Sequence, residues 1–116
     1  MRVTTQSQAI TIGNRVRTFI RKRGHTALGR FEHAIQRVDV YLKDINGPRG
    51  GQDKQVNVVV FMTGGSRVAA EARGRSLYAS VALAIDRAKR QIRRTHRKFH
   101  EAGKTADRHL PNSQID

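Results

Sequence analysis

The 116-residue sequence, with a mass of 13.1 kDa, has the length of one domain. It contains 23 Lys and Arg residues against 9 Asp and Glu residues, so its formal net charge is +14. The absence of Cys excludes disulfides, a thiol nucleophile and a thiolate metal site. No apolar run approaches the roughly 20 residues of a membrane-spanning helix, and the N-terminus lacks the apolar stretch of a secretory signal. We therefore expect a soluble cytoplasmic domain that binds a polyanion, with nucleic acid as the first candidate and an anionic membrane as the second.

The chain opens with a short strand over residues 2–6, followed by an amphipathic helix that begins near Gly13 or Asn14. Apolar residues at helical spacing give this helix one apolar stripe, with the basic residues off it. The stripe consists of Val16, Phe19, Ile20, Ala27, Phe31 and Ile35. Gly24 and Gly29 each cost up to about 1 kcal/mol inside a helix, which weakens the helical preference of this segment.

Three segments with a period of two follow the helix. Val38–Leu42 and Arg67–Arg73 alternate apolar and polar residues and predict half-buried strands, whereas Gln55–Met62 is apolar enough for a central strand. Asn46–Gly51 and Thr63–Ser66 are rich in turn residues and predict the connections between these strands.

The second helix is more regular than the first, and Ser76 is suited to cap its N-terminus. Its apolar stripe consists of Tyr78, Val81, Ala82, Ile85, Ala88 and Ile92. Arg residues recur at three- and four-residue spacing on a different face. Lys89, Arg93 and Lys98 broaden this basic face, and only Asp86 interrupts it. This Arg row consists of Arg87, Arg90, Arg94 and Arg97.

These elements predict an α+β fold of order β-α-β-β-β-α, in which two helices pack on one face of a mostly antiparallel four-stranded sheet, as in double-stranded-RNA-binding domains. Residues 1–98 would form the domain, and residues 99–116 a polar, flexible tail.

Enzymatic and metal-binding hypotheses find little support. No two acidic residues have a spacing that pairs them on one helix face as acid and base. His96 and His100 are four residues apart, but a metal site would need a third ligand from Glu101 or Asp107, and solvated side chains are the simpler interpretation. Residues 103–105 resemble the end of a phosphate-binding loop whose first Gly is replaced by Lys98. We expect no catalysis, cofactor, metal or small-molecule substrate.

Gly47–Gly50 matches the G-x-x-G loop of KH modules, which bind single-stranded RNA. In those modules the loop joins two helices, whereas here it would join two strands. A hairpin turn is therefore the better interpretation, and Gly64 and Gly65 likewise predict a hairpin turn with positive φ.

The basic helix faces are the most informative feature. Exposed faces usually mix signs, because like charges four residues apart repel, yet the Arg row contains no Glu partner. Arg favours bidentate contact with phosphate. The sequence is only 5% aromatic, and Phe19, Phe31 and Tyr78 are expected in the core, which argues against a base-stacking platform. The mode of binding that remains is recognition of the backbone and the shape of folded RNA.

The second helix also resembles the ribosome hibernation factors, known as ribosome-associated inhibitor A or sigma-54 modulation proteins. Ser76–Ala82 and Arg87–Arg94 follow the family pattern, and residues 44–54 resemble a linker of one branch. Val16–Ile20 and Phe31 fit the first helix, so that the resemblance spans residues 2–98. This sequence has Ser76 and Ala82 where the family has acids, Thr26 where it has a basic residue, and no long-form dimerisation domain.

The resemblance implies a domain that binds the small ribosomal subunit and covers the mRNA channel and the tRNA sites during stress or stationary phase. Its basic pattern falls on Arg23, Arg87, Arg90 and Arg94, and the helix faces add Lys22, Arg30 and Arg97 as RNA-binding candidates. We expect a monomer away from the ribosome and no membrane partner. The alternative is an architectural protein that coats nucleic acid without specificity, and a metal enzyme using His96 and His100 is a third class.

Overall fold

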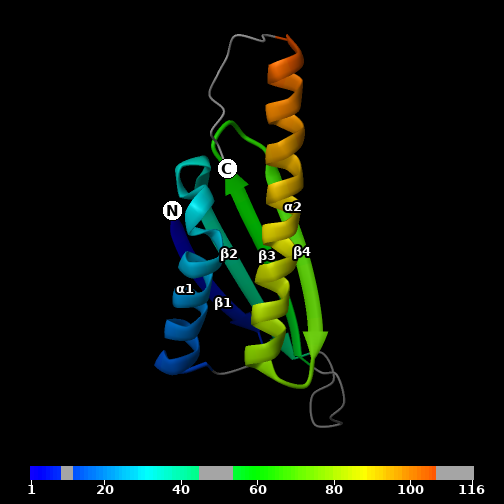
Figure 1. Cartoon of the computed structure of the whole chain (residues 1–116). Coiled ribbons are helices and arrows are strands. Elements are labelled where there is room, and N and C mark those ends of the chain that lie inside the picture. Colours follow the sequence, from blue (N-terminus) through cyan, green and yellow to red (C-terminus); the bar gives the residue numbers. More distant parts are fainter. Residues whose placement is uncertain (9–11, 45–53, 107–116) are drawn as a thin grey trace.

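The computed structural model describes residues 1–8, 12–44 and 54–106, with side chains placed as far as Thr95. Four strands form one sheet, and the two helices lie side by side on one of its faces (Figure 1). The elements are β1 (Arg2–Gln8), α1 (Asn14–Leu28), the 3₁₀ helix η1 (Gly29–Ala34), β2 (Ile35–Asp44), β3 (Lys54–Met62), β4 (Arg67–Gly74) and α2 (Leu77–Ala106). The predicted order and fold class are confirmed, while the predicted turn at Asn46–Gly51 lies outside the described residues.

The strands lie in the order β1-β2-β3-β4. β1 runs parallel to β2, because α1 carries the chain back to the same end of the sheet, and Val3 pairs with Val38. β2 with β3 and β3 with β4 are antiparallel pairs, so the prediction of a mostly antiparallel sheet is confirmed. β1 and β4 therefore form the two edges.

The turn between β3 and β4 is closed by backbone hydrogen bonds, including one of 2.9 Å from Met62 N to Ser66 O. Gly64 and Gly65 have φ of 98° and 100°, a region that other residues rarely adopt. The predicted hairpin with positive φ is thus confirmed.

The core lies between the sheet and the helices. The inward residues of β2 and β3 (Val38, Val40, Leu42, Val56, Val58 and Val60) are all buried. From α2, Val81, Ile85, Ala88 and Ile92 pack against them. Tyr78 departs from the predicted stripe, because 43% of it is exposed and its ring meets Phe19 of α1 edge-on, with centroids 4.9 Å apart. Tyr78 therefore joins the two helices at the rim of the core instead of filling its interior.

The first helix is shorter than its apolar stripe predicts. α1 ends at Leu28, Gly29 starts the tighter turns of η1, and Ile35 already belongs to β2. Phe31 stays buried although it lies outside the α-helix. Gly24 costs helix propensity but is buried where α1 crosses β1, since a Cβ there would lie 3.3 Å from Val3 Cγ2.

The second helix begins as predicted and ends later. The Ala79 amide donates to Ser76 Oγ over 3.2 Å, which confirms the N-cap. The backbone of α2 continues to Ala106, past the predicted domain boundary at residue 98, so part of the proposed tail is helical. Among the described residues, no helix combines the length and the apolarity needed to cross a membrane.

Candidate nucleic-acid interface

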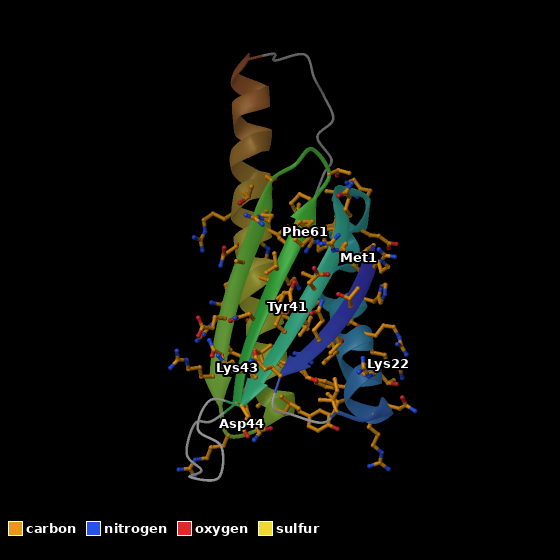
Figure 2. All side chains as sticks on the ribbon, turned by 180° about the vertical axis from the view of Figure 1, so that it is seen from behind. Met1, Lys22, Tyr41, Lys43, Asp44 and Phe61 are labelled. Carbon is orange, nitrogen blue, oxygen red and sulfur yellow. The ribbon has the colours of Figure 1, made fainter. Side chains whose placement is uncertain are left out.

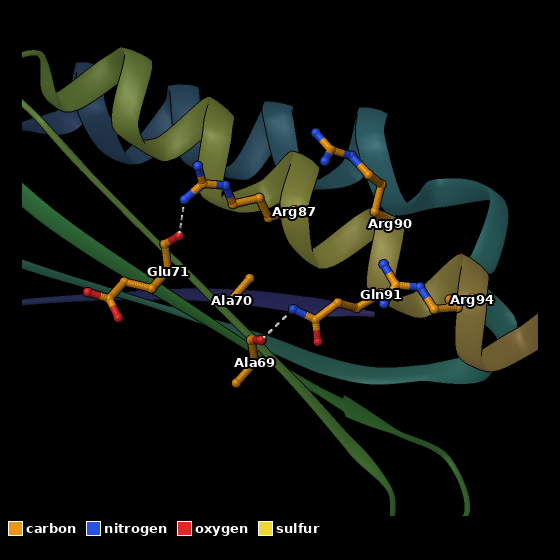
Figure 3. A pocket seen from close by; sticks show the side chains of 7 residues that line it. All are labelled: Ala69, Ala70, Glu71, Arg87, Arg90, Gln91 and Arg94. Carbon is orange, nitrogen blue, oxygen red and sulfur yellow. Dashed lines mark hydrogen bonds between the residues drawn. The ribbon is translucent and has the colours of Figure 1, made fainter.

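A shallow groove of about 370 Å³ runs between α2 and the edge strand β4. Arg87, Arg90 and Arg94 line it from the helix, together with Gln91, as Figure 3 shows. Three of the predicted RNA-binding residues therefore meet on one surface, which we call the α2–β4 groove. All three Arg side chains are exposed to solvent and can meet a phosphate there.

Two side chains of the α2–β4 groove also bind the strand edge. Arg87 Nη1 donates to the Glu71 carbonyl and Gln91 Nε2 to the Ala69 carbonyl, each over 2.8 Å (Figure 3). These bonds attach α2 to β4. The bond from Arg87 uses one of the five N–H donors of its guanidinium group. Gln91 was not predicted as a site residue, since only the tertiary structure places it opposite a strand carbonyl.

Asp86, the one acid expected on this face, is paired with Arg90. Arg90 Nη2 lies 2.7 Å from Asp86 Oδ2, an ion pair between residues four apart on the helix. The hydrogen bond from Arg90 holds the pKa of Asp86 below its ordinary value, with the positive charges of Arg90, Lys89 and Arg23 acting in the same direction. Asp86 thus fixes the position of Arg90, although both side chains are still at least half exposed to solvent.

A second groove, of about 300 Å³, lies on the other flank of α2, toward α1. Arg23 and Thr26 line it from α1, and Asp86 and Lys89 from α2. This α1–α2 groove places Arg23, an RNA-binding candidate from the family resemblance, beside Lys89 of the second helix. Lys89 was expected only to broaden the basic face, but its position makes it a second cation of this groove.

The remaining predicted residues lie outside both grooves. Lys22 is exposed on α1, as Figure 2 shows from behind. Arg30 is exposed on η1, where its guanidinium lies 5.5 Å from the centroid of the Phe31 ring. Arg97 lies on the backbone of α2, and its side chain is outside the described residues.

The part of the chain with described side chains contains no group of three His, Asp or Glu residues that could hold a metal. The side chains of His96 and His100 lie outside that part. Among the described residues, the two basic grooves gather cations from both helices, and their chemistry suits phosphate.

Comparison with known proteins identifies the family. Residues 3–100 match the family described as sigma 54 modulation protein / S30EA ribosomal protein. The chain belongs to this family. The S30EA family is ribosome-associated by its description, which agrees with the resemblance of the second helix. A search of curated proteins finds no match.

Solved structures share the S30EA fold. A ribosomal subunit interface protein from Coxiella burnetii has a TM-score of 0.71 at 21% identity, covering 83% of this chain and 98% of the other. The N-terminal domain of Protein Y from Thermus thermophilus has a TM-score of 0.66 at 20% identity, covering 82% and 99%. At these identities the likeness concerns the fold, and the chemistry must come from the residues of this chain.

Proposed function

We propose that this S30EA protein inhibits translation by binding the small ribosomal subunit through rRNA and covering the mRNA channel and the tRNA sites. The observation that supports this most is the alignment of Arg87, Arg90 and Arg94 along one groove. The action would be occupancy of a site without chemistry, during stress or stationary phase in the cytoplasm. The names of the structural relatives, a ribosomal subunit interface protein and Protein Y, point in the same direction.

The positions of the two grooves suggest how folded RNA would be engaged. The α2–β4 groove and the α1–α2 groove lie on opposite flanks of one helix. An α-helix with its side chains is about 10 Å wide, so α2 could lie between two phosphate backbones with Arg87 and Arg94 on one and Arg23 and Lys89 on the other. Such a contact depends on the shape of the RNA more than on its base sequence.

Co-sedimentation with purified ribosomal subunits tests the proposal. We expect stoichiometric binding to the small subunit in excess duplex DNA, and loss of binding when mRNA and tRNA are bound first. The alternative is an architectural protein that binds nucleic acid without specificity. It predicts that the protein pellets equally with both subunits and that duplex DNA competes this binding away, because the net charge of +14 alone would drive it.

A pair of variants tests the site. Arg90→Glu combined with Arg94→Glu should abolish small-subunit binding, because the groove then repels phosphate. Arg87 is left in place because it also binds β4. The matched control is Arg15→Glu with Arg17→Glu, which makes the same change in charge at exposed positions of α1 outside both grooves. Equal loss in both pairs would mean that net charge alone drives binding.

A further inference from the structure

The face of the sheet opposite the helices is covered by no described element (Figure 2). Strand alternation and register place basic side chains from three strands on it, and these outnumber the acids there. The basic residues are Arg2, Arg37, Lys43, Arg67 and Arg73, and the acids are Asp39 and Glu71. Both acids are already paired, Asp39 with Arg37 and Glu71 with Arg73. This open face therefore carries unneutralised positive charge on the side of the sheet away from both grooves.

Near one end of the open face, a guanidinium group lies over an aromatic ring. Arg37 Cζ lies 4.3 Å from the centroid of Phe61. Arg37 Nε also lies 3.1 Å from both carboxylate oxygens of Asp39. The Arg37 side chain is still 44% exposed. Because its position is fixed from two directions, Arg37 presents a flat cation to solvent with little freedom left to lose on binding.

Asp39 is the anchor of this arrangement, although it lies on an otherwise open face. It is only 4% exposed and accepts hydrogen bonds from Thr4 Oγ1, over 2.7 Å, and from the Tyr41 hydroxyl, over 3.4 Å. The carboxylate thus fixes Tyr41 as well as Arg37. Tyr41 is 37% exposed and lies in the middle of the sheet, opposite Asn57 of β3 (Figure 2).

We propose that this open face binds single-stranded RNA, with one unpaired base stacked on Arg37, another on Tyr41, and the flanking phosphates held by the surrounding Arg and Lys residues. Proteins recognise unpaired bases by stacking them on aromatic rings and on guanidinium planes. A protein partner would require more exposed apolar area than the one large side chain, Tyr41, that is exposed on this face. This second RNA contact is independent of the two grooves on the helical side and does not require the proposed ribosome binding.

Two aromatic residues of the open face bear on the expectation that the chain has no stacking platform. That expectation concerned Phe19, Phe31 and Tyr78 only. Phe61 lies on the outward side of β3 next to Arg37, and Tyr41 lies on the outward side of β2, four residues further along that strand.

The chain offers a spectroscopic probe of this surface, since it has 2 Tyr and no Trp. In a Tyr78→Phe variant, Tyr41 is the only source of tyrosine fluorescence. Titration with a short single-stranded oligouridylate should quench that fluorescence to saturation, because the base stacks on the ring. Inorganic polyphosphate, which has charge but no base, should not quench it. In the reciprocal Tyr41→Phe variant, Tyr78 should not respond to the oligouridylate.

Affinity variants provide the decisive comparison. Arg37→Lys keeps the charge but removes the plane and should weaken oligouridylate binding about tenfold, whereas Arg75→Lys, at an exposed position outside the sheet, should leave it unchanged. Tyr41→Ser, which removes an exposed ring, is a second variant in case Arg37→Lys disturbs folding. Wild-type affinity in Arg37→Lys and Tyr41→Ser, or equal quenching by polyphosphate, would overturn the proposal.

Two further outcomes would also overturn it. Tighter binding of the matching oligodeoxynucleotide would mean that the open face selects DNA over RNA. Weaker ribosome binding by Arg37→Lys with unchanged oligouridylate binding would mean that the face contacts a component of the ribosome other than single-stranded RNA. If the wild-type chain quenches with oligouridylate but does not bind small subunits, the proposed function fails while this inference stands.

Discussion

Asp39 carries a negative charge on a buried side chain, which is costly unless the charge is compensated. Burial alone would raise its pKa. The hydrogen bonds from Thr4 and Arg37, the charge of Arg37 and the hydrogen bond from Tyr41 together outweigh that effect, so that the pKa of Asp39 lies below its ordinary value of 3.8. The folded protein therefore favours the ionised carboxylate and gains stability from it.

This shift predicts how stability depends on pH. Because the pKa is lowered on folding, the unfolded chain takes up the proton first as the pH falls. The contribution of Asp39 is complete above about pH 5 and is lost progressively as the pH falls below the ordinary pKa of 3.8. Asp39→Asn should reduce the free energy of unfolding at neutral pH by about 2 kcal/mol, the value of hydrogen bonds to a charged group, and should flatten its decline in acid. Urea unfolding at a series of pH values measures both, and an unchanged acid decline would contradict the assignment.

Arg87 and Arg94 differ in what they do in the free protein, although both line the α2–β4 groove. Arg87 binds the Glu71 carbonyl, so Arg87→Ala should lower the free energy of unfolding by about 0.5 kcal/mol, the scale of one exposed hydrogen bond. Arg94→Ala is the matched control, with the same truncation, and should leave stability unchanged. Both variants should weaken binding to small subunits. Equal stability of the two variants in urea unfolding would count against the structural role of Arg87.

At the scale of the elements, α2 supplies most of the proposed interface, and its start depends on Ser76. Ser76→Ala removes the hydrogen bond to the Ala79 amide and should lower the free energy of unfolding by about 1 kcal/mol. The control is Ser66→Ala in the hairpin, because there the backbone carbonyl, and not the hydroxyl, makes the contact. Thermal unfolding of both variants measures the difference, and a shift of similar size in the control would argue against a specific cap.

The elements themselves could be predicted from periodicity, because buried and exposed positions alternate along β2 and β3 and recur along α2. The end of α1 could not be predicted in this way. Phe31 continues the helical spacing of apolar residues, but it belongs to the 3₁₀ helix η1, from which its side chain is buried in the core. The interface was predicted in part. Helical spacing gathers Arg87, Arg90 and Arg94, but the contact of Gln91 with β4 depends on the tertiary structure.

The open face shows a different limit of sequence interpretation. Alternation along β2 already places Tyr41 opposite the buried side of Val40 and Leu42. The partner of Asp39 on β1 could not be found in this way, because Thr4 meets it only through the parallel register of β1 on β2. A network across strands requires that register, which no local pattern encodes.

At the scale of the whole molecule, the excess positive charge predicts a steep dependence of ribosome binding on salt. If about six phosphates are neutralised, affinity should fall roughly 10³-fold between 50 and 200 mM salt. Arg90→Ala with Arg94→Ala should reduce the slope of log affinity against log salt by about two, whereas Arg15→Ala with Arg17→Ala should leave it unchanged. Affinity measured over a salt series tests this, and a slope near zero would refute a phosphate-dominated contact.

The parallel placement of β1 also bears on the order in which the chain folds. Thr4 and Asp39 are 35 positions apart, whereas β2, β3, β4 and α2 are neighbours in sequence and contact one another directly. Contacts between distant positions require the costly closure of a long loop, so β1 should dock after the transition state. Substitutions in β1 would then speed unfolding and leave the folding rate almost unchanged. The last strand to arrive is thus the one that completes the anchor of Arg37.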